Sequence, residues 1–239
     1  METTIVITGF FIIAYLYSVV GHGGASGYIA WMVLVGFGQS EIRPLALEFN
    51  IIVSLIATVQ FFRSGYFLPR LFWPFTLTSV PLAWIGGTMQ VDVTWFRILL
   101  GICLVAAIMR LLLSVTDSEA HSRPPLILAL VIGAFIGLLS GMIGIGGGVL
   151  LSPVLLLARW SDQKQASAIA APFILVNSIA ALLAGGSGFM THVKMPYIIP
   201  AVVIGGILGS VSGSHKFGFR TIRYVLATVL LIALVKLVV

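Results

Sequence analysis

A near-continuous series of apolar runs, separated only by short polar loops, limits what this sequence can fold into. The runs cover 5–20, 28–38, 44–62, 71–90 and 95–113, and then 125–143, 149–158, 166–185, 196–212 and 221–239. Of the 239 residues, 59% are hydrophobic and only 8% are charged, which is more apolar surface than a soluble domain of this size can bury. A helix needs about 20 apolar residues to cross the hydrocarbon core, and several runs reach that length. The sequence therefore predicts an all-α polytopic membrane protein with about 8–10 helical segments.

The second series of runs repeats the first. The glycine cluster at 21–24 matches the cluster at 144–147, an offset of 123 residues (144 − 21). The same offset pairs two further dipeptides with their copies: Ser64-Gly65 with Ser187-Gly188, and Phe96-Arg97 with Phe219-Arg220. One constant offset across both halves indicates an internal duplication.

The duplication predicts the organisation of the chain. We expect a first repeat at 1–113, a polar linker at 114–125 and a second repeat at 126–239. Each repeat would hold a glycine-broken or re-entrant segment followed by three transmembrane helices. The formal charge of +6 lies mostly in short loops, where we interpret it as an orientation signal rather than a nucleic-acid-binding surface.

The distribution of Lys and Arg predicts how the two halves are oriented. If each broken segment folds back on itself, each half crosses the membrane an odd number of times and the halves are inverted. One side then has nine basic residues, namely Arg63, Arg70, Arg110, Arg123, Arg159, Lys164, Lys216, Arg220 and Arg223. The other side has four, namely Arg43, Arg97, Lys194 and Lys236. Parallel halves would give six against seven, so the positive-inside rule favours inverted repeats with both termini outside.

The two glycine clusters are the candidate binding site. Each glycine costs about 1 kcal/mol relative to alanine inside a helix, so both clusters should interrupt their helices. Such a break at membrane depth lines a cavity or is buried in protein, although close helix packing is an alternative reason for glycine. Short helices would start near Tyr28 and Val149, with free N–H groups that favour an anion. The candidate residues are Gly21, His22, Gly23, Gly24 and Ser26 in the first half, and Gly144, Gly146, Gly147 and Gly148 in the second.

Several polar side chains inside apolar runs add to this candidate site. Ser54 and Asn177 match at the same offset (177 − 123 = 54) and would either contact the anion or bond neighbouring helices. Glu48 is either a proton-coupling group or a structural carboxylate paired with Arg43. His22 is a second proton-coupling candidate, with a hydrogen-bonded structural role as the alternative. Further candidates are Asn50, Ser152, Pro153 and Ser178.

The second glycine cluster resembles a known family signature. Residues 137–153, Gly-Leu-Leu-Ser-Gly-Met-Ile-Gly-Ile-Gly-Gly-Gly-Val-Leu-Leu-Ser-Pro, are similar to the signature of the sulfite exporter TauE/SafE family, and length and duplicated plan agree. The resemblance implies an exporter of sulfur-containing anions such as sulfite, sulfoacetate and other organosulfonates. The first copy departs from the pattern at four positions, with His22 for Ile145, Ala25 for Gly148, Ser26 for Val149 and Ala30 for Pro153.

We therefore expect a secondary carrier that exports small sulfur-containing anions across a bacterial inner membrane, coupled to protons or to the membrane potential. The expected partners are the anion and the bilayer, with the oligomeric state open and a homodimer as one option. One cysteine and four unclustered histidines predict no metal site, and no cofactor motif is present. We do not expect an enzyme.

Three alternatives remain beside this carrier. Composition does not separate a carrier from a passive anion channel. A carrier of another small ion is a second alternative, although a cation site should contain more acids than Glu48. An intramembrane serine protease is a remote third, because Gly24-Ala25-Ser26-Gly27 fits its motif but a histidine in a later span is missing.

Overall fold

The computed structural model describes residues 3–19, 22–112, 122–186 and 197–214, with seven further residues between 224 and 235. Within these residues the chain forms nine α-helices and no strand. They are α1 (Thr3–Val19), α2 (Ala25–Val35), α3 (Gln39–Arg63), α4 (Pro69–Thr88), α5 (Val93–Leu112), α6 (Leu126–Ile143), α7 (Gly148–Leu157), α8 (Gln163–Ala184) and α9 (Ile198–Ser214). The predicted all-helical class is confirmed. Gly21 and most of both the linker and the last predicted span lie outside the described residues.

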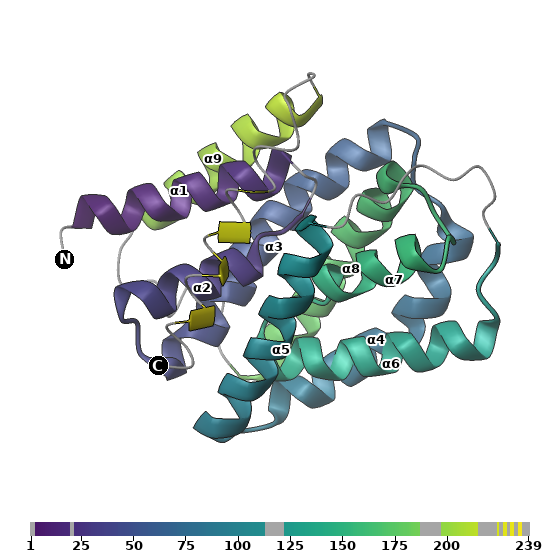
Figure 1. Ribbon diagram of the computed structural model, residues 1–239, viewed down its shortest axis with the longest axis horizontal. Coiled ribbons are helices and arrows are strands. Elements are labelled where there is room, and N and C mark those ends of the chain that lie inside the picture. The colour runs from purple at the N-terminus through teal and green to yellow at the C-terminus, as the bar shows by residue number, and fades with distance from the viewer. Residues whose placement is uncertain are drawn as a thin grey trace.

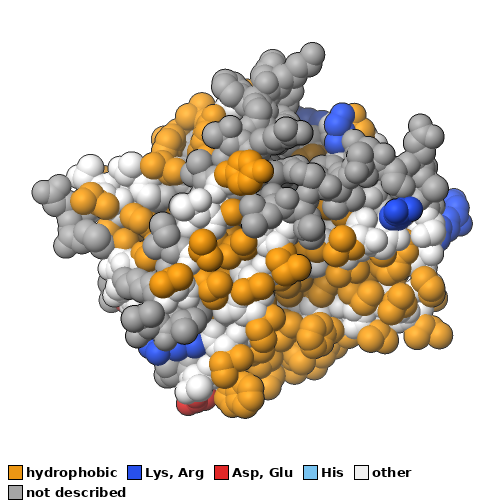
Figure 2. Space-filling view, in the orientation of Figure 1, with side chains coloured by type: hydrophobic (Ala, Val, Ile, Leu, Met, Phe, Trp, Pro, Cys, Tyr) orange, Lys and Arg blue, Asp and Glu red, His pale blue; other side chains and the backbone are white. Residues whose placement is uncertain are grey.

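Helix length and composition fit a membrane. Among the described residues, three helices are long and apolar enough to cross a bilayer, over Ser40–Arg63, Leu126–Ile143 and Lys164–Ala184. Large hydrophobic side chains cover much of one face of the molecule, over α5 and α6 (Figure 2). On α6, Ile127 is 77% exposed and Phe135 is 64% exposed. A continuous apolar surface of this kind is stable against lipid but not against water.

The helices recur at the offset found in the sequence. Moving α1, α2 and α3 by 123 residues gives 126–142, 148–158 and 162–186, which lie within two residues of α6, α7 and α8. Moving α4 gives 192–211, which overlaps α9. The division into two repeats at 1–113 and 126–239 stays a prediction, since much of the linker and of the last span is not described.

The two halves interlock through matched glycine contacts. α6 lies along α4, and α1 lies along α9 (Figure 1). A Cβ on Gly86 would collide with the Leu138 carbonyl, and a Cβ on Gly209 would collide with the Tyr15 carbonyl. These are one contact made twice, because Gly209 and Leu138 lie 123 residues after Gly86 and Tyr15. Small residues at such crossings let two backbones approach closely, which replaces hydrophobic attraction inside a membrane.

The contacts also give the direction of each helix. Gly133, Gly137 and Gly141 of α6 lie against Phe75, Ser79 and Ala83 of α4 in the same order, so these two helices run parallel. In contrast, α3 and α8 run antiparallel. Leu47 of α3 packs with Leu182, whereas Asn50, further along α3, reaches back to Ser178.

The first broken segment folds back on itself. Ser26, at the start of α2, is hydrogen-bonded to Tyr17 near the end of α1. Trp31, further along α2, donates to the carbonyl of Val6 near the start of α1. α2 therefore returns along α1 as the second arm of a helical hairpin.

We predict that Gly137→Ala lowers the apparent melting temperature in detergent. Its Cβ would lie only 2.6 and 2.7 Å from backbone atoms of Ser79, which cannot move without shifting α4. Overpacking of this kind costs about 1–3 kcal/mol. The matched control is Gly206→Ala, whose nearest contacts would be the side-chain ends of Ile56 at 3.3 Å, Val53 at 3.6 Å and Ser18 at 3.7 Å. Equal melting temperatures for the two variants would contradict the proposed role of the α4–α6 contact.

Candidate functional site

Two short helices begin at equivalent positions of the two halves. α2 starts after Gly24 and α7 starts after Gly147, and both glycines adopt left-handed backbone with φ of 93° and 78°. Neither helix has a side-chain hydrogen bond at its N-cap. The first N–H groups of an α-helix have no partner within the helix, so both termini present donors and a positive dipole end to the breaks.

The start of α2 differs from the sequence expectation. α7 begins at Gly148, one residue from the predicted start, but α2 begins at Ala25 rather than near Tyr28. The left-handed backbone of Gly24 completes the change of chain direction in the break, so α2 can begin at the next residue. Ser26 therefore lies in the first turn of α2 rather than in the break.

The two breaks converge on one side chain, that of Asn50 on α3. A Cβ on Gly23 would collide with Asn50 Oδ1, and a Cβ on Gly146 would collide with Asn50 Nδ2. Asn50 Nδ2 also donates to Ser178 Oγ on α8 at 3.0 Å and to the carbonyl of Ile145 at 3.4 Å. The antiparallel pair α3 and α8 thus brings both breaks to a shared junction, which we call the Asn50–Ser178 junction. Close approach of the backbone requires glycine at both break positions.

A histidine connects the first break to the second half. His22 is fully buried, and its Nε2 lies 3.2 Å from Ser152 Oγ on α7. Ser152 in turn donates its hydroxyl hydrogen to the carbonyl of Gly148 at 2.9 Å. Because that hydrogen is engaged, Nε2 is the donor toward Ser152, which places a proton on this ring nitrogen. Pro153 follows on the same helix and is half-buried.

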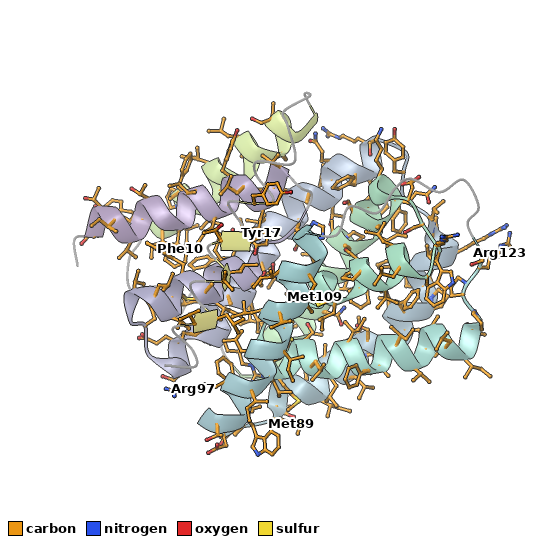
Figure 3. The ribbon with its side chains drawn as sticks, viewed as in Figure 1. Phe10, Tyr17, Met89, Arg97, Met109 and Arg123 are labelled. Atoms are coloured by element: carbon orange, nitrogen blue, oxygen red, sulfur yellow. The ribbon has the colours of Figure 1, made fainter. Side chains whose placement is uncertain are left out.

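The serine of the protease motif has a different partner from the one that catalysis would require. Ser26 Oγ is hydrogen-bonded to the hydroxyl of Tyr17 at 2.8 Å. Tyr17 and Phe10 lie on the side of α1 that faces α2 (Figure 3). His22 directs its Nε2 to Ser152 instead. This geometry gives Ser26 a role in holding the α1–α2 hairpin together.

Ser54 and Asn177, matched in sequence, make separate contacts. Ser54 Oγ donates to the carbonyl of Ile51 in its own helix at 3.4 Å. Asn177 Nδ2 donates to the carbonyl of Phe173 at 2.8 Å, and its Oδ1 accepts from the hydroxyl of Ser79 on α4. Both side chains are fully buried. Asn177 therefore bonds across the repeats to Ser79, and a separate polar contact between the repeats joins Asn50 to Ser178, which the sequence gave only as further candidates.

The remaining candidates lie around this junction or beside it. Gly144 ends α6 with φ of 90° and packs on Arg43, while Gly148 faces Ile174. Glu48 is only 1% exposed. It lies two residues before Asn50, so the two side chains leave α3 about 200° apart. Glu48 thus belongs to another face of α3, and its coupling role stays a prediction.

Three buried polar atoms beside the breaks have no hydrogen-bond partner among the described residues. They are Asn50 Oδ1, the hydroxyl of Tyr28 and the hydroxyl of Ser140. The Tyr28 ring would lie 3.0 Å from a Cβ on Gly24, and Ser140 Cβ would lie 3.5 Å from a Cβ on Gly147. Leaving a polar group unsatisfied in the interior costs about 1–3 kcal/mol, so such a cluster fits a place where a ligand or water binds.

The sequence analysis did not single out Tyr17, Tyr28 or Ser140. The repeat offset could have found two of them, since Ser140 lies 123 residues after Tyr17 and both are polar positions just before a break. Tyr28 carries no such signal, because an aromatic residue in an apolar run is indistinguishable from core. Within the described part of the chain, no group of three or more His, Cys, Asp or Glu side chains could hold a metal ion.

Paired interruptions at equivalent positions of two interlocked halves are the architecture of a membrane transporter. Comparison with known proteins agrees. The family model for "Sulfite exporter TauE/SafE" matches residues 5–237. A protein of Sinorhizobium fredii (strain NBRC 101917 / NGR234), described as "Probable membrane transporter protein y4hK", is 36% identical over 234 residues, which cover 95% of both chains. No solved structure matches the chain.

The chain therefore belongs to the sulfite exporter TauE/SafE family. This confirms the family resemblance drawn from residues 137–153.

We predict that Gly146→Ala destabilises the protein more than Gly186→Ala. Both glycines have left-handed backbone, with φ of 71° and 68°, so both substitutions carry the same strain of about 1–2 kcal/mol. A Cβ on Gly146 would also press on Asn50, on Ser178 Oγ at 2.8 Å and on Ile174 at 2.9 Å, whereas one on Gly186 would meet nothing within 4 Å. Apparent melting temperatures in detergent measure the difference. Equal shifts would mean that the second break is not packed against the junction.

Proposed function

We propose that this protein is a secondary transporter that exports small sulfur-containing anions, such as sulfite or an organosulfonate. The anion would bind between the N-termini of α2 and α7, beside the Asn50–Ser178 junction. The observation that carries this proposal is the convergence of two helix starts, neither capped by a side chain, on one buried junction. The sulfur-containing substrate is supported by membership of a family described as sulfite exporters.

The geometry suits an anion that must bind and then leave. Helix N-termini attract negative charge through backbone N–H groups and the aligned peptide dipoles, without a buried cation that would hold the anion too tightly. The hydroxyls of Tyr28 and Ser140 have no hydrogen-bond partner among the described residues and lie next to these termini, so they could add donors to a bound oxyanion. Ser54 and Asn177 lie on the same two helices and would act by supporting the junction.

The two repeats would be inverted and would alternate access by rocking against each other. Two structural facts support this proposal: the equivalent helices α3 and α8 run antiparallel, and α2 folds back along α1. The charges support it as well. Lys164, at the start of α8, lies 3.2 Å from the Tyr66 hydroxyl, so it lies at the same end of the molecule as Arg63 and Arg70. Positive charge gathered at that end would make it cytoplasmic, with both termini outside, in a bacterial inner membrane.

Proton coupling would use Glu48 or His22. Both are buried, and His22 bridges the first break to α7 through Ser152. A change in the charge of this imidazole would be felt at both breaks, because the bond to Ser152 crosses between the halves. Glu48 would act from the far side of α3, about 200° around the helix from Asn50.

A transporter is favoured over an enzyme. The similarity to a protein described as a probable membrane transporter extends over 95% of this chain, and Ser26 is bonded to Tyr17 rather than arranged as a nucleophile. A passive anion channel would use the same binding elements. Counterflow of labelled anion against a gradient distinguishes a carrier, which exchanges, from a channel.

The proposal predicts selective binding of sulfite that Asn50→Asp weakens. This substitution keeps the shape of the side chain but replaces a donor with a negative charge beside the anion, and affinity should fall at least about tenfold. Titration calorimetry of the purified protein measures it, with sulfate, thiosulfate, sulfoacetate, taurine, chloride and monocarboxylates as competitors. Gln60→Glu makes the same chemical change on α3, ten residues further on, and should leave the affinity within about threefold.

Two results would contradict the proposal. Equal affinity for sulfite and chloride would remove the sulfur-anion assignment and leave the membrane fold intact. Unchanged sulfite affinity in Asn50→Asp would mean that the anion binds away from the junction.

A further inference from the structure

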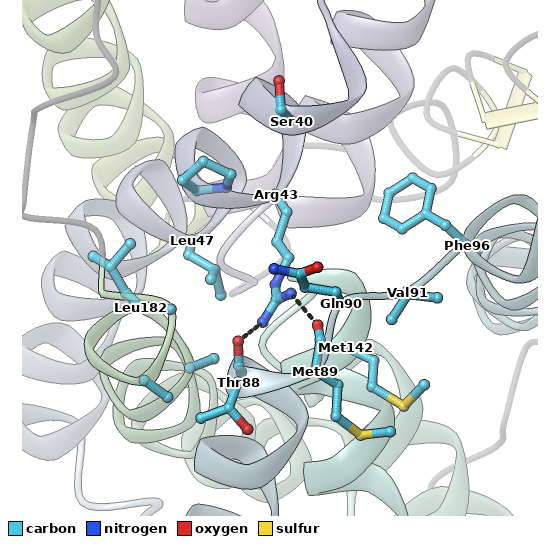
Figure 4. A pocket seen from close by; sticks show the side chains of 15 residues that line it. Ser40, Arg43, Leu47, Thr88, Met89, Gln90, Val91, Phe96, Met142 and Leu182 are labelled. Atoms are coloured by element: carbon cyan, nitrogen blue, oxygen red, sulfur yellow. Dashed lines mark hydrogen bonds between the residues drawn. The ribbon is translucent and has the colours of Figure 1, made fainter. Parts of the chain in front are cut away.

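A cavity of about 610 Å³ lies beside the start of α3 and the end of α8, and Figure 4 shows the side chains that line it. Its walls come from both halves: the start of α3, the end of α4 and the loop after it, the end of α6 and the end of α8. Ser40, Arg43, Thr88 and Gln90 supply polar side chains to the lining. Leu47 and Leu182 lie at its inner side and pack together as a small apolar cluster.

Arg43 is the cationic side chain of this lining. Its Nη1 donates to the carbonyl of Met89 at 3.0 Å, and its Nη2 donates to the carbonyls of Gly86 at 3.1 Å and of Gly87. These partners are neutral carbonyls at the end of α4, where the helix dipole is negative. A guanidinium has five N–H donors, so three hydrogen bonds leave two of them, and neutral carbonyls offset its positive charge only in part.

The charge of Arg43 is not part of the duplicated plan. The position 123 residues later is Ala166, which is buried against other apolar side chains. If Arg43 only capped the end of α4, we would expect an equivalent residue in the second half, just as the glycine contacts have equivalents in both halves. The second break also lies against this side chain, since a Cβ on Gly144 would be 3.1 Å from Arg43 Cγ.

The cavity points along α3 and α8 toward the junction. On α3, Leu47 follows Arg43 by about one helical turn and Asn50 follows Leu47 by about another. On antiparallel α8, Leu182 packs beside Leu47, and Ser178, four residues earlier in the chain, lies about one turn closer to the junction. Leu47 and Leu182 are 1% and 4% exposed. They therefore form one apolar layer between the cavity and the Asn50–Ser178 junction.

We infer that the Arg43 cavity is the vestibule through which the anion reaches or leaves the junction on this side, and that Leu47 and Leu182 form its closed gate. The inference rests on the proposed anion transport. Arg43 would attract an oxyanion and bind two of its oxygens side by side. Rocking of α8 against α3 would then part the two leucines and open the path inward. The other side of the membrane would use a different route, because no cation stands at Ala166.

Substitution of Arg43 tests its role in admitting the anion. Sulfite flux into proteoliposomes would be measured for Arg43→Gln and Arg43→Lys as a function of sulfite concentration. We expect Arg43→Gln to raise the KM for sulfite about fivefold or more, and Arg43→Lys to raise it less, because the charge is retained. Arg97→Gln is the matched control. It removes an exposed arginine near the start of α5, at the same end of the molecule but outside the cavity lining, and should leave KM unchanged.

A second variant tests the vestibule without altering Arg43. In a Cys103→Ala background, Gln90→Cys places a thiol in the lining, and a sulfonate-bearing maleimide forms a thioether that sulfite does not reverse. Labelling followed by removal of the reagent should reduce flux at least about fivefold, since a bulky anion then fills the vestibule. Thr94→Cys, exposed nearby but outside the lining, should lose no flux when labelled.

The outcomes separate the two proposals. If Asn50→Asp abolishes sulfite flux while Arg43→Gln and labelled Gln90→Cys behave like their controls, the vestibule is wrong and the central site stands. If Arg43→Gln fails to fold, labelled Gln90→Cys decides the question alone. If the unmodified protein carries no sulfite, the transport proposal fails and the vestibule fails with it.

Discussion

Unsatisfied backbone groups are the constraint on which the rest of this structure depends. In hydrocarbon, an unpaired N–H or C=O costs several kcal/mol, so a helix can end at membrane depth only where protein covers the end. This chain has two such ends, at Gly24 and Gly147, and encloses both. The hairpin of α1 and α2 covers the first, α6 and α8 cover the second, and α3 with α8 hold the two together through Asn50 and Ser178. The donors that have no partner among the described residues are those that the proposed anion would use.

The enclosure requires the halves to be intertwined rather than placed side by side. α6 of the second half packs along α4 of the first, and α1 of the first packs along α9 of the second. Glycines carry both contacts, at Gly86 and Gly209, because only backbone-to-backbone approach supplies enough dispersion attraction between helices in lipid. The proposed rocking of one half against the other would therefore slide along these glycine contacts while the junction between them opened and closed.

Symmetry and its exceptions divide the molecule by role. The repeated features are helix bounds, glycine seams and helix starts, which build a scaffold with a central site. The unrepeated features are polar: His22 stands where the second half has Ile145, Asn50 where it has Phe173, and Arg43 where it has Ala166. Each of these makes a contact that its counterpart could not make, to Ser152, to Ser178 and to the end of α4. These differences make the two entrances to the proposed site unlike each other, whereas two identical inverted halves would present the same entrance to both sides.

The sequence by itself determined the membrane class, the helical segments, the offset of 123 residues and the two breaks, because these follow from hydropathy, glycine and repetition along the chain. It also determined the family, through residues 137–153. Only the tertiary structure decided which polar residues meet. Ser54 and Asn177 match in sequence but turn to separate partners, whereas Asn50 meets Ser178 because α3 and α8 cross antiparallel. The exposed and buried faces of apolar helices look alike in sequence, so contacts such as Tyr28 beside Gly24 and Leu47 beside Leu182 arise only when the helices pack.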